Sequence, residues 1–219
     1  MSNEEDDRRQ TSNENEGLIE RVRRALELTE GVEIARRYMA MNAFDGALTM
    51  LGLILGGLFT IDSTHPEVSF AAVLLAASGA TVAMTISGFS GSYLAERAER
   101  DREVQDIGRA MLRDMSDTMY ARASKTTSIV VALVDGASPA VTALIVLSPL
   151  LLVPIGVLNY YSAFEVAIVM CLVLLYLLGV FLGHVSRKNV WKYGLRTLTA
   201  GVITAILMLL IAFATGEIA

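Results

Sequence analysis

The chain has 219 residues, and 53% of them are hydrophobic. Uncharged stretches of about 20 residues recur along it, and each is long enough to cross ~30 Å of hydrocarbon as a helix. This composition excludes a soluble domain. The single cysteine, Cys171, excludes a disulfide framework and a thiolate metal site within one chain.

The N-terminal part of the chain is polar and charged. Residues 1–17 are rich in Asn, Glu and Asp without apolar periodicity, which predicts a disordered acidic tail rather than a signal peptide. Residues 18–37 carry an apolar stripe, beginning with Leu18 and Val22, within a charged segment. This pattern predicts a cytoplasmic amphipathic helix that lies against the membrane or the base of the protein.

Five apolar segments predict five transmembrane helices, so the expected fold class is an all-α integral membrane protein. Residues 38–95 hold the first two helices, and residues 126–219 hold the last three. Residues 96–125 form a charged segment, which is expected to be a short cytoplasmic helical extension between helices 2 and 3. The predicted spans are Tyr38–Ile61, Val68–Ala95, Thr126–Leu158, Val166–Val185 and Leu198–Thr215.

The distribution of lysine and arginine predicts the orientation of these helices. Seven of these residues precede the first span, seven lie between the second and third spans, and four lie between the fourth and fifth, which accounts for all 18. Cytoplasmic loops carry the excess of these residues in membrane proteins. The N-terminus is therefore predicted in the cytoplasm and the C-terminus outside. The expected location is multi-pass in a membrane, the cell membrane if the source is prokaryotic.

Two aspartates lie inside predicted spans. Asp45 lies about 12 Å and Asp135 about 15 Å into the membrane at the helical rise per residue. A charge at the bilayer centre costs at least about 2.5–3.5 kcal/mol, so each acid indicates a function. Asn42 and Thr49 share the helix face of Asp45, and such oxygen ligands suit divalent cations. The alternative is that Asp45 is protonated and hydrogen-bonds a neighbouring helix.

The second span has one face of small and polar residues, and a row of carboxylates continues this face beyond the membrane. Together they predict a route for cations from the cytoplasm. The alternative is a packing seam of small residues followed by a solvated helix face. The polar face comprises Ser78, Thr81, Thr85, Gly88 and Ser92, and the carboxylates are Glu96, Glu99, Glu103 and Asp106.

The first span also contains a motif for close helix contact. Gly52 and Gly56 form G-x-x-x-G just beyond Asp45. This spacing lets two helices touch at their backbones and often marks dimers. A homodimer packed through the first helix is therefore predicted, although the motif alone has low specificity because glycine is common in membrane helices.

Four segments of the chain follow the order and the helix positions of one transporter family. They are Asn42-Ala43-Phe44-Asp45-Gly46, then Gly91-Ser92-Tyr93 with Asp101-Arg102-Glu103, then Ser148-Pro149-Leu150-Leu151, and finally Lys192-Tyr193-Gly194-Leu195-Arg196-Thr197-Leu198 with Gly201. On these segments the chain resembles the vacuolar iron transporter family, which includes the yeast calcium- and manganese-tolerance transporter. The resemblance extends from about Arg36 to Gly216.

The resemblance implies a homodimer whose pathway is lined by the first two helices. It also implies export of ferrous iron or a similar divalent metal from the cytoplasm, coupled to inward proton movement. Asp45 matches the family's essential acid on the first helix. Glu96, Glu99 and Glu103 fall where the family builds a cytoplasmic metal-capturing domain.

The chain departs from the family pattern inside the membrane. Ser92 replaces the glutamate of the family's G-E-F segment, Gly88 replaces a methionine, and Met84 lies one turn away. Asp135 has no counterpart in the pattern, and we expect it to supply a second carboxylate or to carry a proton. The predicted pathway residues are Asn42, Asp45, Thr49, Met84, Ser92 and Asp135, and the predicted metal ligands are Asp45, Glu96, Glu99, Glu103 and Asp106.

The leading hypothesis is a transporter that exports iron or manganese, in its divalent form, by proton antiport. Under this hypothesis, the protein is expected to have no enzymatic activity, no permanently bound cofactor and no nucleic-acid partner. Its expected partners are metal ions, protons and the lipid bilayer. The first alternative is a non-transporting membrane scaffold in which both aspartates are structural. The second is an intramembrane aspartyl protease with Asp45 and Asp135 as a dyad. Such proteases resemble one another in a G-x-G-D segment, whereas here a glycine follows each aspartate, which disfavours this alternative.

Overall fold

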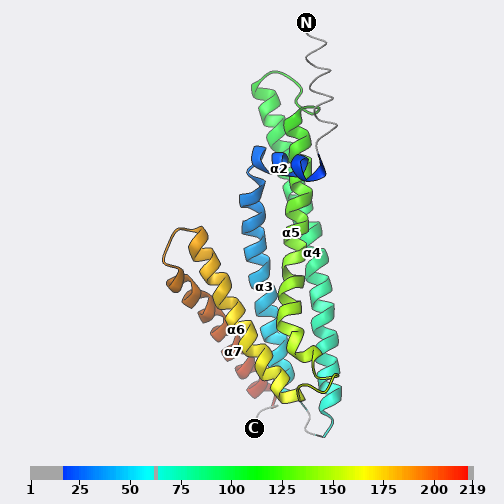
Figure 1. Cartoon of the computed structure of the whole chain (residues 1–219), viewed down its shortest axis with the longest axis vertical. Helices are drawn as coiled ribbons and strands as arrows, with labels where there is room; N and C mark the ends of the chain where they lie inside the picture. The colour runs from blue at the N-terminus through cyan, green and yellow to red at the C-terminus, as the bar shows by residue number, and fades with distance from the viewer. Residues whose placement is uncertain (1–16, 62–63, 217–219) are drawn as a thin grey trace. The chain divides into compact units, whose positions relative to one another are not determined.

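The structure, a computed structural model, describes residues 17–61 and 64–216, and over these residues its only regular secondary structure is helical. Five of the helices are long and apolar enough to cross a membrane, which confirms the predicted number of spans. The expected N-terminal tail lies outside the described residues, apart from Gly17. The helices, shown in Figure 1, are α2 (Leu18–Leu28), α3 (Gly31–Phe59), α4 (Pro66–Ala110), α5 (Met119–Leu151), α6 (Tyr160–Val185) and α7 (Val190–Thr215).

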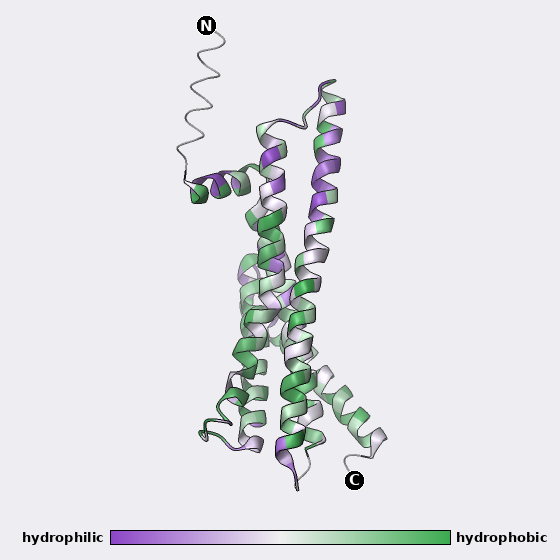
Figure 2. Ribbon diagram, turned by 90° about the vertical axis from the view of Figure 1, so that its right-hand side faces the viewer, coloured by the Kyte–Doolittle hydropathy of each residue, from purple (hydrophilic) through white to green (hydrophobic). Residues whose placement is uncertain are grey.

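The chain forms two compact units, and helices α3, α4 and α5 contribute to both. The first unit consists of the described residues up to Arg36 together with Ser90–Leu133. The second unit consists of Arg37–Phe89 together with the described residues from Val134 onward. Along α4 the residues change from mostly apolar in the second unit to mostly hydrophilic in the first, as Figure 2 shows.

The core of the second unit lies between α3, α4, α5 and α6. Its largest fully buried side chains include Met50 and Ile54 of α3, Leu150 of α5, and Phe164 and Leu175 of α6. Lipid tails are as apolar as these side chains, so helices associate in a membrane through close packing rather than through transfer from water. The complementary shapes of these side chains therefore hold the spans together.

Helices α6 and α7 run side by side (Figure 1), and they touch through glycines. A Cβ atom at Gly179 would lie 2.7 Å from the Cα atom of Gly194, and one at Gly183 would lie 2.7 Å from the Cα atom of Val190. Real Cβ atoms do not approach a backbone so closely. Only glycine therefore fits at these two positions of α6, and the two helices contact backbone to backbone.

Helix α5 ends earlier than the sequence predicts. The third span was expected to reach about Leu158, whereas α5 ends at Leu151 and turns follow it. Pro149 lies in its last turn and Pro154 just beyond, and each proline removes a backbone N–H and clashes with continued helix. The 33 residues of α5 are still enough for a span.

In the first unit the helix expected over residues 18–37 is broken by a turn. Thr29 ends α2, and Glu30 adopts a left-handed conformation with a φ angle of 53° before α3 begins. A Cβ atom at Gly31 would lie 2.6 Å from the side chain of Thr127. The turn therefore packs tightly against α5, and only a small residue fits at its end.

The charged segment over residues 96–125 is helical except at residues 111–118. Helix α4 continues to Ala110, and the link turns at Leu112, whose φ angle is 52°. The extension between the second and third spans thus consists of the end of α4 and the start of α5, rather than of one uninterrupted helix.

Candidate functional site

Asn42 of α3 and Asp135 of α5 are hydrogen-bonded to each other within the second unit. The side-chain nitrogen Nδ2 of Asn42 donates to the carboxylate oxygen Oδ1 of Asp135. Asp135 is only 3% exposed, and Asn42 is partly buried. A buried carboxylate needs such donors because apolar surroundings offer no water in their place. From the sequence, Asn42 was expected to act together with Asp45, and its hydrogen bond to Asp135 was not predicted.

Helix α4 approaches the Asn42–Asp135 pair through a glycine. A Cβ atom at Gly88 would lie 3.3 Å from the Cα atom of Gly136 and 3.4 Å from Nδ2 of Asn42. A Cβ atom at Gly136 would lie 2.9 Å from the carbonyl oxygen of Thr85. The absence of side chains at these two glycines lets α3, α4 and α5 meet around the pair.

Pro139 makes another close contact between α5 and α3. Its Cα atom would lie 3.0 Å from a Cβ atom at Gly46, the residue that follows Asp45. Proline has no N–H to donate to the carbonyl of Asp135, four residues earlier, so α5 departs from regular helical bonding at this level. The glycines that follow the two aspartates, Gly46 and Gly136, both lie at helix contacts.

Asp45 and Thr49 lie on the exposed side of α3, together with Met41. Asn42 is one turn from Asp45 but bonds to Asp135 instead. In the described part of the chain, no group of three or more His, Cys, Asp or Glu residues could hold a metal ion. One copy therefore offers no complete carboxylate cage around Asp45. An exposed and a buried aspartate also give no support to a protease dyad, whose carboxylates share one proton.

The polar face of the second span is engaged mainly within the chain. The hydroxyl groups of Thr81 and Thr85 donate to carbonyl oxygens of their own helix at 2.7 and 2.8 Å. Met84 packs against the hydrophobic core of the second unit, and Ser92 is buried in the first unit. Ser78, in contrast, is exposed. These contacts favour a packing role for the part of the face around the two threonines.

Two of the four cytoplasmic carboxylates are held by Arg100, in the first unit. Its guanidinium group lies 3.7 Å from Glu96 and 3.2 Å from Glu103. It also donates to the carbonyl oxygen of Thr29 at 2.9 Å, and the hydroxyl group of Tyr120 donates to Glu103 at 2.7 Å. The sequence interpretation missed Arg100, although its position four residues after Glu96 and three before Glu103 indicates such ion pairs.

The other two cytoplasmic carboxylates, Glu99 and Asp106, are exposed. Asp106 lies 3.8 Å from Arg102 and 3.6 Å from Arg109, with all three side chains open to solvent. Exposed ion pairs of this kind contribute about 0–1 kcal/mol. Glu99 and Asp106 are therefore more accessible to a cation than Glu96 and Glu103.

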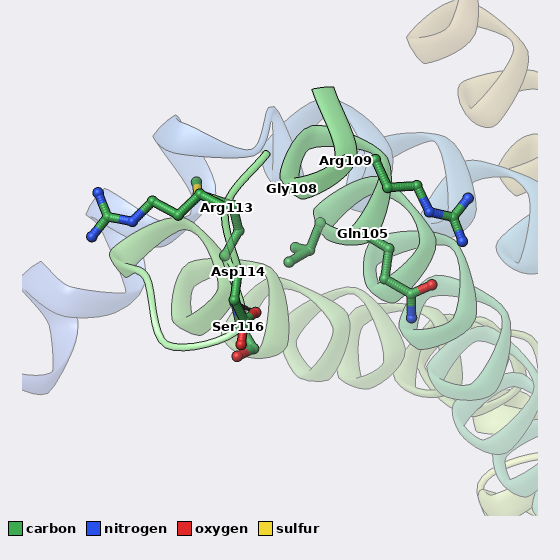
Figure 3. Close-up of a pocket in the computed structure, with 8 residues that line it drawn as sticks. Gln105, Gly108, Arg109, Arg113, Asp114 and Ser116 are labelled. Carbon is green, nitrogen blue, oxygen red and sulfur yellow. Dashed lines mark hydrogen bonds between the residues drawn. The ribbon is translucent and has the colours of Figure 1, made fainter. Parts of the chain in front are cut away.

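An open pocket of about 370 Å³ lies at the link between α4 and α5 (Figure 3). Arg109 and Arg113 extend away from each other at its two sides. The backbone N–H of Ser116 donates to Asp114 at 2.9 Å and lowers the pKa of that carboxyl group. The charged groups do not converge, so we assign the pocket no ligand. Its lining is Val104, Gln105, Gly108, Arg109, Arg113, Asp114, Met115 and Ser116.

Five long apolar helices define a multi-pass membrane protein. The VIT family model matches residues 104–213, about half of the chain, and the chain belongs to this family. This match confirms the resemblance drawn from the sequence. Two of the four segments that carried the resemblance, at residues 148–151 and 192–201, lie within the matched residues, and the other two precede them.

One relative is an uncharacterized protein of Methanocaldococcus jannaschii. It is 28% identical over 183 residues, which are 82% of this chain and 89% of that protein. No solved structure matches the chain. Membership of the VIT family suggests transport of a metal such as iron or manganese, and transporters of this family are not enzymes.

Proposed function

We propose that the protein exports a divalent metal ion, iron or manganese, from the cytoplasm by proton antiport. Family membership supports metal as the cargo. The single structural observation that carries the proposal is Asp45, an exposed acid within a candidate span. An ionised carboxylate facing lipid costs at least about 2.5–3.5 kcal/mol. Asp45 therefore needs both a functional role and a partner that shields it from lipid.

We propose that a second copy of the chain, packed through α3, shields Asp45 from lipid. Two copies of Asp45 would then share one cation and supply the two negative charges that a divalent ion needs in a low dielectric. A Cβ atom at Gly52 would have no neighbour within 4 Å, which leaves room for another helix. At Gly56 a Cβ atom would lie 3.2 Å from the side chain of Met208, so that glycine is already covered within the chain.

The proposed membrane pathway keeps the residues expected from the sequence. Asp45 and Thr49 are exposed and provide carboxylate and hydroxyl oxygens. For the cytoplasmic acids, we propose that Glu99 and Asp106 make the first contact with metal, because Glu96 and Glu103 are engaged by Arg100. The full proposed set is Asn42, Asp45, Thr49, Met84, Ser92 and Asp135 in the pathway, with Glu96, Glu99, Glu103 and Asp106 as additional metal ligands.

The test is uptake of individual metals into proteoliposomes that contain the purified protein, with and without a pH gradient. Ferrous iron or manganese should accumulate, and the rate should rise when the gradient drives protons in the opposite direction. Calcium and cobalt in parallel assays would define the metal selectivity. A protein that moves none of these ions would instead support the membrane scaffold.

A further inference from the structure

The contact between Asn42 and Asp135 fixes the orientation of an amide next to Asp45. An ionised carboxylate can only accept hydrogen bonds, whereas an amide has a donating nitrogen and an accepting oxygen. The nitrogen of Asn42 therefore turns towards Asp135, as observed, and its oxygen Oδ1 turns away from it. Within the described residues, no hydrogen bond to Oδ1 of Asn42 is present.

We infer that Asp135 is a positioning residue, which holds the Asn42 amide so that Oδ1 binds the transported cation together with Asp45. This inference rests on the proposed transport function. Amide and carboxylate oxygens are both ligands for hard divalent cations. Asn42 and Asp45 lie three residues apart on α3, which places them about 4.5 Å apart along the helix axis. A donor bond to a carboxylate also polarises the amide and strengthens its carbonyl as a ligand.

The surroundings of Asp135 support an indirect role. Asp135 is 3% exposed, whereas Asp45, one turn from Asn42 on α3, is exposed. Gly88 closes over the pair, because a Cβ atom there would lie 3.4 Å from Nδ2 of Asn42 and 3.5 Å from the carbonyl oxygen of Asp135. Asp135 is thus held among helices, and Asn42 connects it to the exposed face. Groups that orient a metal ligand typically change metal affinity about 10–100-fold when they are removed.

The experiment compares manganese uptake by proteoliposomes for the wild type, Asp135→Asn, Asp135→Ala, Asn42→Ala and the double alanine variant. Asp135→Asn keeps an oxygen that accepts the bond from Asn42 but adds a nitrogen that can donate to Oδ1, so its KM should rise, by less than in Asp135→Ala, while its pH profile should be unchanged. Asp135→Ala should raise KM about 10–100-fold with little change in kcat. In the Asn42→Ala background, Asp135→Ala should have no further effect.

Two results would overturn the inference while leaving the proposed function intact. Asp135→Asn could lose transport as completely as Asp45→Asn or shift the pH profile, which would show that Asp135 acts through its charge or carries a proton. Asp135→Ala could alternatively leave KM unchanged. If that variant does not fold, Asp135→Asn and Asn42→Ala decide the matter alone, because the inference requires both to raise KM without changing the pH profile. A wild type that moves no metal would refute the proposed function as well.

Discussion

The guanidinium group of Arg100 donates to the carbonyl oxygen of Thr29 at 2.9 Å and thereby ties the end of α2 to α4 within the first unit. The same group compensates the charge of Glu96, which is buried. Removing one partner of a buried ion pair leaves the other charge without compensation.

We therefore expect Arg100→Gln to lower the free energy of unfolding by about 3–5 kcal/mol. Thermal unfolding of the protein in detergent measures this change. Arg102→Gln is the matched control, since its side chain is 76% exposed, and it should alter stability by less than about 0.5 kcal/mol. Equal losses in both variants would show that the contacts of Arg100 do not stabilise the fold.

Gly136→Ala should destabilise the second unit. The added Cβ atom would lie 2.9 Å from the Cβ atom of Phe89 and from the carbonyl oxygen of Thr85, so α4 and α5 must separate. Overpacking of this kind costs about 1–3 kcal/mol. Gly79→Ala is the control, because a Cβ atom there has no neighbour within 4 Å. Detergent melting curves of the two variants should differ clearly, and coincident curves would contradict the observed helix contact.

Asp45→Asn should abolish metal transport while the protein still inserts and folds. The substitution keeps the size of the side chain but removes the exposed charge that the proposed cation binds. Proteoliposome uptake and size-exclusion chromatography measure the two properties. Asp117→Asn, in the exposed link between α4 and α5, should transport normally. Normal transport by Asp45→Asn would place the pathway elsewhere.

Gly52→Leu should dissociate the proposed homodimer. Small residues let two membrane helices approach closely, and a leucine would force the two copies of α3 apart. Cross-linking in native membranes measures the dimer. Gly79→Leu on α4 provides a control with equal added volume at another open position, and it should leave the dimer intact. If the wild type is monomeric by this assay, a second copy of the chain does not shield Asp45 from lipid.

The orientation inferred from lysine and arginine predicts which loops can be labelled from outside the cell. In a Cys171→Ser background, Val157→Cys should react with a membrane-impermeant thiol reagent in intact cells. Lys188→Cys should react only after the membrane is opened, because its loop carries the cytoplasmic excess of positive charge. Both positions are exposed in the structure. The reverse labelling pattern would invert the predicted topology.

The number of spans could be predicted because each one contains a long apolar segment, and all lysines and arginines lie outside these segments. The break at Thr29 and Glu30 could not be predicted in this way. It depends on Arg100 and Thr127, which lie far along the chain and contact the turn only in the folded first unit. Local periodicity carries no information about such contacts.

The hydrogen bond from Asn42 to Asp135 could not be predicted from the sequence for a related reason. Residues three apart differ by about 60° around a helix, so periodicity assigns Asn42 and Asp45 to one face. The packing of α5 divides that face, because Asn42 bonds to Asp135 while Asp45 remains exposed. Periodicity thus locates polar residues within a turn, and the neighbouring helix decides which of them it contacts.

The backbone contact of α6 with α7 at Gly179 and Gly183 has a consequence for motion. Helices that touch without intervening side chains cannot rotate or slide past each other without first separating, so this hairpin must move as one rigid piece. Alternating access requires one part of a transporter to rock against another. We therefore expect α6 and α7 to keep their mutual contact in every state of the proposed transport cycle, so that any rocking takes place at other helix contacts.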